Sequence, residues 1–114
     1  MDNSILNNIK KLLGMPAEYT AYDTDIIIHI NSVLSHLSQM GVTSTDSTFQ
    51  IEDNTATWDD FINNDDDILS SVKTYIYLKV KLLFDPPVNS SLLTSIENQI
   101  KEYEVRLYTQ KGGY

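Results

Sequence analysis

The chain has 114 residues, 41% of them hydrophobic, which is enough to form the core of one domain and excludes wholesale disorder. It contains no cysteine, which excludes disulfides, thiol catalysis and cysteine-ligated zinc, and it has no apolar run long enough to span a bilayer. Sixteen acidic against eight basic residues give a net charge of −8, which disfavours tight nucleic-acid binding because phosphates bind clustered Lys and Arg.

Residues 4–41 are predicted to form two amphipathic helices. Apolar residues at helical spacing predict the first helix over residues 4–13. Gly14 and Pro16 end this helix, and the basic Lys10 and Lys11 suit its last turn, where the helix dipole favours positive charge. The same spacing predicts a second helix from residue 23 or 24 to residue 41. Ile28 falls on the polar face of this second helix, where it is either an ordinary exposed residue or an interface contact.

From residue 42 to residue 66 the helical period is lost, which predicts a long irregular arm. Residues 49–51 and 55–58 could form a short β-hairpin, and residues 57–60 resemble the capping box of a one-turn helix that carries Trp58, Phe61 and Ile62. Because the arm holds few apolar anchors, we expect it to be poorly protected in the isolated chain.

The arm also carries the excess acid. Residues 41–67 contain eight acidic residues and no Lys or Arg, so this segment accounts for the whole net charge of −8, while the other eight acids and eight bases cancel. The sequence therefore predicts a neutral scaffold with one acidic insert. Its acidic residues are Asp46, Glu52, Asp53, Asp59, Asp60, Asp65, Asp66 and Asp67.

Two further helices complete the predicted fold. The most apolar one covers residues 67–84, should be central, and ends before Pro86 and Pro87. The last covers residue 90 or 91 to residue 108, with Glu97–Lys101 and Glu102–Arg106 as pairs on its exposed face, and a flexible tail follows over residues 109–114. The predicted class is therefore all-α: one domain over residues 1–108, a small bundle of four main helices with the acidic arm inserted between the second and the third.

The sequence offers no recognisable catalytic or ligand-binding pattern. His29 and His36 lie seven residues apart on one helix, about 10.5 Å along its axis, which is too far to share one metal ion. Residues 59–67 lack the central Gly and the distal Glu of a calcium-binding loop. No phosphate-binding loop or nucleophile elbow occurs. We therefore predict a protein that is not an enzyme, with no catalytic, cofactor-binding or metal-binding residues.

Five segments in chain order carry a resemblance to a known family. They are LLGMPAEY (12–19), DTDIIIHINSVL (23–34), FQIEDNTATW (49–58), VKTYIYLKVKLLFDPP (72–87), which is the most specific, and residues 97–107. In these segments the chain resembles the head–tail connector proteins of long-tailed phages, which are also described as head-completion or DNA-packaging adaptors. The resemblance covers nearly the whole chain, but none of the matching residues is a catalytic signature.

The resemblance implies a structural protein of the virion neck that assembles in the host cytoplasm. It implies a homo-oligomeric ring, twelve-fold on the portal, that extends the DNA channel after packaging and offers a docking surface to neck and tail proteins. The implied partners are other copies of the chain, the portal protein and the next stopper or tail-completion protein. DNA would pass without specific binding, and no cofactor or membrane is implied. The alternative is a small acidic helical binding or regulatory module of phage or bacterial origin.

A row of basic and aromatic residues on the helix over 67–84 suggests where subunits meet. Lys73, Tyr77 and Lys81 form a ridge on its polar face, which is either a solvated row or a surface that meets acids from the arm of a neighbouring copy. The candidate subunit-interface residues are Lys73, Tyr77, Lys81, Asp59, Asp60, Asp65, Asp66, Asp67, Trp58 and Ile28. The candidate residues for docking to the portal or neck are Tyr108, Lys111 and Tyr114.

Overall fold

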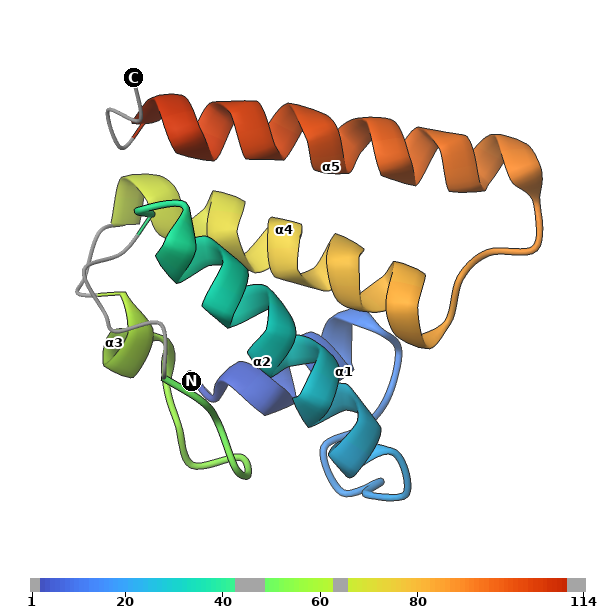
Figure 1. The fold of residues 1–114 in the computed structure, drawn as a ribbon. Helices are drawn as coiled ribbons and strands as arrows, with labels where there is room; N and C mark the ends of the chain where they lie inside the picture. The colour runs from blue at the N-terminus through green and yellow to red at the C-terminus, as the bar shows by residue number, and fades with distance from the viewer. Residues whose placement is uncertain (1–2, 43–48, 63–65, 111–114) are drawn as a thin grey trace.

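The computed structural model describes residues 3–42, 49–62 and 66–110, and helices dominate it (Figure 1). The helices in chain order are α1 (Ile5–Leu12), α2 (Asp23–Gln39), the one-turn α3 (Trp58–Phe61), α4 (Asp66–Phe84) and α5 (Ser90–Gln110). The described residues contain no β-strand. The predicted all-α class is confirmed, and the four main helices begin and end within two residues of their predicted bounds.

The central element is α4. It packs against α1, α2 and α5, and Figure 1 shows α5 along one side of α4, with α1 and α2 on the other. Side chains that point in several directions from α4 are buried, which is possible because apolar residues cover more than half of its circumference. The fully buried residues of α4 are Val72, Tyr75, Ile76 and Val80.

Two glycines end α1 and α2 in the same way. Gly14 and Gly41 have φ angles of +85° and +81°, a left-handed conformation that glycine adopts without a Cβ clash. Each glycine and the residue after it donate their N–H groups to carbonyls of the last helical turn, at 2.8–3.1 Å. Val42, which follows Gly41, is fully buried, so the chain returns to the core immediately after α2 ends.

A buried ion pair holds the loop between α1 and α2. The Lys10 side chain is fully buried, its Nζ lies 2.8 Å from Asp23 Oδ1, and it donates a hydrogen bond to the Ala17 carbonyl at 2.9 Å. The sequence predicted only a helix-end charge at this position. Lys10 lies on the same stripe as Leu6 and Leu13, so the loop that covers this stripe also encloses the ammonium group and must supply its partners.

We expect Lys10→Met to lower the free energy of unfolding by about 2–4 kcal/mol, because the Asp23 carboxylate would lose its cation while only 24% of its side chain is exposed. Lys11→Met makes the same chemical change at an exposed neighbour and should cost less than about 0.5 kcal/mol. Urea unfolding of both variants measures the difference. Equal effects would show that the pair does not hold the loop.

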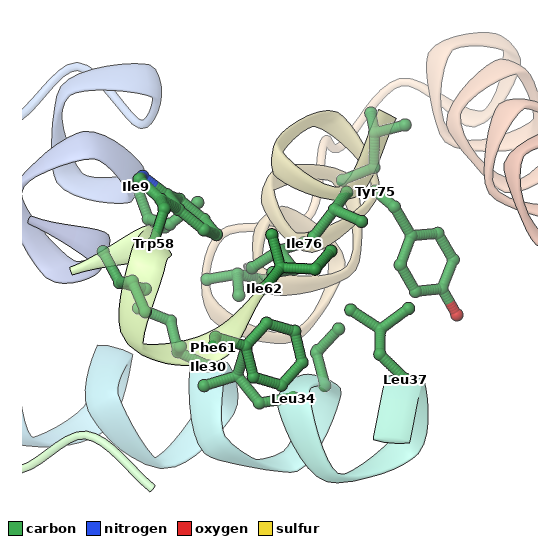
Figure 2. Close-up of a cluster of buried hydrophobic side chains, with 14 of the residues drawn as sticks. Ile9, Ile30, Leu34, Leu37, Trp58, Phe61, Ile62, Tyr75 and Ile76 are labelled. Atoms are coloured by element: carbon green, nitrogen blue, oxygen red, sulfur yellow. The ribbon is translucent and has the colours of Figure 1, made fainter. Parts of the chain in front are cut away.

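The described part of the arm, residues 49–62, folds onto the helices. Ile51, Trp58, Phe61 and Ile62 are all buried, and Figure 2 shows Trp58 beside Ile9 of α1 while Phe61 points toward α2. The expectation of a weakly anchored arm is therefore wrong for this part. Its anchors are few, but each of them reaches the core that α1, α2 and α4 share.

The predicted hairpin between residues 49–51 and 55–58 does not form. Instead, the Ile5 N–H donates to the Ala56 carbonyl at 3.0 Å, and the Trp58 N–H donates to the Asn3 carbonyl at 3.2 Å. The antiparallel bridge at this point is isolated. This pairing has a physical advantage, because the first N–H groups of α1 have no acceptor within their own helix. The predicted one-turn helix is confirmed, and its capping box includes a 2.8 Å bond from the Thr57 N–H to Asp60 Oδ2.

The other end of the arm is held by one amide side chain of α2. The Ile51 N–H donates to Asn31 Oδ1 at 2.8 Å, and Asn31 Nδ2 donates to the Ile51 carbonyl at 3.0 Å. Asn31 therefore satisfies both backbone groups of a buried residue, as a neighbouring strand would.

We predict that the Ile51 amide exchanges slowly in the isolated chain and that Asn31→Ala accelerates this exchange about 5- to 30-fold, which corresponds to a loss of roughly 1–2 kcal/mol. Ser32→Ala, on the next and exposed position of α2, is the matched control and should leave the Ile51 rate unchanged. Hydrogen exchange by NMR measures both rates. Fast exchange in the wild-type chain would contradict this anchoring.

Candidate functional site

The described residues present exposed apolar and charged side chains that are candidates for contact surfaces. They contain no group of three or more His, Cys, Asp or Glu side chains that could hold a metal ion. No helix among them combines the length and the apolar character that crossing a membrane requires. The features that remain are exposed apolar side chains and patches of charge, which are the usual material of protein–protein contacts.

The predicted basic ridge has partners within its own chain. Lys73 Nζ lies 5.4 Å from the centroid of the Trp58 ring, and Lys81 Nζ lies 2.9 Å from the Asp85 carboxylate. Tyr77 is partly buried and packs against the core. Acids from a neighbouring copy would be needed to balance this ridge only if the arm did not fold back on its own helix. The arm does fold back, through Trp58, so the ridge alone gives no reason for a neighbour.

The acidic and aromatic candidates of the arm separate into three groups. Asp59 and Asp60 are exposed on α3, and Asp60 also caps that helix. Trp58 is only 2% exposed and its Nε1 donates to Asn8 Oδ1 at 3.0 Å, so it is a core residue of its own chain, and its role as an apolar contact with another subunit stays a prediction. Asp65 and the side chains of Asp66 and Asp67 lie outside the described residues.

The remaining candidates lie on α2 and at the end of α5. Ile28 is 59% exposed, as its position on the polar face of α2 predicted. Tyr108 is also exposed, and α5 continues two residues beyond the predicted end, to Gln110. Lys111 and Tyr114 lie outside the described residues.

A hollow of about 580 Å³ lies on the exposed side of α1, and we call it the α1 hollow. Its lining combines apolar side chains, among them the half-exposed Leu12, which we call the floor, with two cations, Lys11 and Lys73, which we call the rim. It is bounded by α1, the loop after α1, and α4. Its lining consists of Asn3, Asn7, Asn8, Lys11, Leu12, Met15, Pro16, Ala17, Glu18 and Lys73.

A second surface lies where α4 ends and α5 begins, and we call residues 83–92 the α4–α5 corner. Leu83 and Leu92 are each 53% exposed, Val88 is fully exposed, and 65% of the Asp85 side chain is exposed. Three large apolar side chains are thus exposed within ten residues. Such a concentration is more typical of a contact surface than of a solvated turn, where single exposed apolar residues are the rule.

A polar contact joins α4 to the C-terminal half of α5. The buried Tyr75 hydroxyl donates to Glu104 Oε2 at 2.8 Å, and His36 Nε2 of α2 lies 4.0 Å from the same oxygen. Burial raises the pKa of Tyr75 well above its ordinary value of 10.0, and the hydrogen bond and charge of Glu104 raise it further. This contact was not predicted from the sequence, although a tyrosine inside the most apolar helix needs a hydrogen-bond acceptor for its hydroxyl.

The two predicted ion pairs on α5 have different outcomes. Arg106 Nη2 lies 3.0 Å from Glu102 Oε1, so this pair is confirmed. In the described part of α5, Glu97 and Lys101 form no ion pair. Lys101 is thus an exposed cation that forms no ion pair with another described residue.

We expect Tyr75→Phe to lower the free energy of unfolding at pH 7 by about 1–2 kcal/mol, because Glu104 would lose a buried donor. Tyr19→Phe, at an exposed tyrosine, should cost less than about 0.5 kcal/mol. Since the pKa of Tyr75 is higher in the folded state, the stability due to its proton is complete below about pH 10 and is lost as the pH rises further. Urea unfolding between pH 7 and pH 11 should therefore show a flatter decline for Tyr75→Phe, and parallel declines would contradict this assignment.

Comparison with known proteins identifies a family. A family model described as "Phage connector protein" matches residues 5–114, which include every helix of the structure. No curated protein and no solved structure matches the chain.

Proposed function

The chain belongs to the phage connector protein family, and from this premise we propose that it acts as a head–tail connector, a structural adaptor that forms a ring beneath the portal. The ring extends the DNA channel once packaging is complete and provides the surface on which neck and tail proteins dock. The observation that carries this proposal is the family match over residues 5–114. This match includes all five described helices rather than one helix pair.

The charge of the arm supports the same role. Glu52, Asp53, Asp59 and Asp60 are all exposed, and no Lys or Arg lies in the arm. Within the Asp53–Thr55 turn, the Thr55 hydroxyl and N–H donate to the Asp53 carboxylate and lower its pKa. A surface of this kind at a channel would repel phosphate and let DNA slide without binding.

The proposal includes specific partners. Copies of the chain form the ring, twelve-fold on the portal, and the portal protein and the next neck protein contact its two faces. Tyr108, at the end of α5, is exposed, which supports a docking role for this residue. The proposed docking residues also include Lys111 and Tyr114. The protein then resides in the neck of the virion after assembly in the host cytoplasm.

We predict that a phage with a stop codon early in this gene makes heads that contain or leak DNA and that fail to join tails. Electron microscopy of the lysate measures the fraction of joined particles, and the wild-type chain supplied from a plasmid should restore joining. Normal joined virions from the mutant phage would overturn the connector role and favour a small regulatory module instead.

A further inference from the structure

We propose that the α1 hollow receives the α4–α5 corner of a second copy of this chain, so that Val88 and Leu92 cover the apolar floor and Asp85 faces Lys11 and Lys73. The inference rests on the connector role proposed above and deepens it, because a ring requires one surface of each copy to meet a different surface of the next.

The two surfaces complement each other in shape and polarity. The α1 hollow is concave and its floor includes Leu12, whose side chain is half exposed. The α4–α5 corner presents Val88, which is fully exposed, and Leu92, which is 53% exposed. Insertion of these side chains would remove apolar area from water on both copies, and this is the main source of affinity in protein contacts.

The charges of the two surfaces are also complementary. Lys11 is exposed and forms no ion pair among the described residues, and Lys73 Nζ lies over the face of the Trp58 ring rather than beside a described carboxylate. Asp85 has one partner, Lys81, but 65% of its side chain remains exposed and able to accept more. Glu18, on the loop side of the hollow, would repel Asp85. The corner is therefore oriented with Asp85 toward Lys11 and Lys73 and away from Glu18.

The positions of the surfaces suit a head-to-tail contact. Figures 1 and 2 both show α1 and α5 on opposite sides of α4. The α1 hollow and the α4–α5 corner are formed by different residues. A copy that uses both surfaces would therefore contact two neighbours, and the contact can repeat.

Cross-linking tests this contact cleanly because the chain has no cysteine of its own. The double variant Leu12→Cys with Val88→Cys, treated with a short bismaleimide, should give a ladder of dimers, trimers and larger species on a denaturing gel. Leu12→Cys with Val105→Cys is the matched control, because Val105 is a comparably exposed valine on α5 outside the corner. A ladder no stronger than that of the control, or only an internal cross-link, would overturn the proposal.

Mixing separates a head-to-tail contact from a symmetric one. When the single variants Leu12→Cys and Val88→Cys are mixed, they should form one cross-linked heterodimer and nothing larger, since each copy carries only one reactive side. Dimers of equal amount from either single variant alone would indicate a symmetric contact and overturn the proposal.

The charged part of the contact has its own test. In the cross-linkable double variant, Lys11→Glu should weaken the ladder by about two- to fivefold, as expected for an exposed ion pair. Lys101→Glu makes the same charge change at an exposed lysine of α5 and should leave the ladder unchanged. Equal loss in both variants would show an effect of net charge alone and overturn the pairing of Asp85 with this rim.

The cross-linking is repeated with the portal ring present, because a template raises the local concentration of subunits. A chain that binds the portal without forming the Leu12–Val88 cross-link would overturn this interface and leave the connector role intact. A chain that forms the ladder but neither binds the portal nor restores tail joining would overturn the connector role and leave the interface intact.

Discussion

Burial of α4 is the constraint on which the other elements depend. A helix with buried side chains on several sides must be packed against from more than one direction. A chain of 114 residues has few other segments that can do so. α1 and α2 cover one side and α5 covers another. The remaining gap near Ile76 is filled by the arm, which contributes Phe61 and Ile62 to the core. The described part of the arm, residues 49–62, is therefore a structural part of the domain, even though it carries four acidic residues.

The sequence predicted the helices well because their signals are local. Apolar periodicity located the four main helices, and Gly14 and Gly41 marked two of their ends, since a left-handed residue is needed where the helix closes. The docking of the arm was not predictable in the same way. Ile51 and Trp58 follow no regular period, and their positions depend on acceptors far away in the sequence, namely Asn31 and Asn3.

The candidate interface was harder to predict than the fold, for a physical reason. A basic side chain on a helix face looks fully available until the neighbouring segment is placed, and Trp58 of the arm lies against Lys73, which stays only partly exposed. Lys10 shows the opposite case, because it was predicted only as a charge at the helix end, yet it lies between Leu6 and Leu13 on the apolar stripe and is fully buried. The family match identifies a role for the whole chain but assigns no residue to it, so contact surfaces must be argued from exposure and charge.

The docked arm also gives the molecule a built-in optical reporter. Trp58 is the single tryptophan of the chain, and it is enclosed by α1, with its indole N–H bonded to Asn8 and its ring under the Lys73 ammonium. Its fluorescence therefore arises from one known environment, without background from other indoles. Any event that lifts the arm from α1, whether unfolding or a rearrangement on a portal, exposes this ring to water and shifts its emission to longer wavelength, so the state of the arm can be followed in the unlabelled protein.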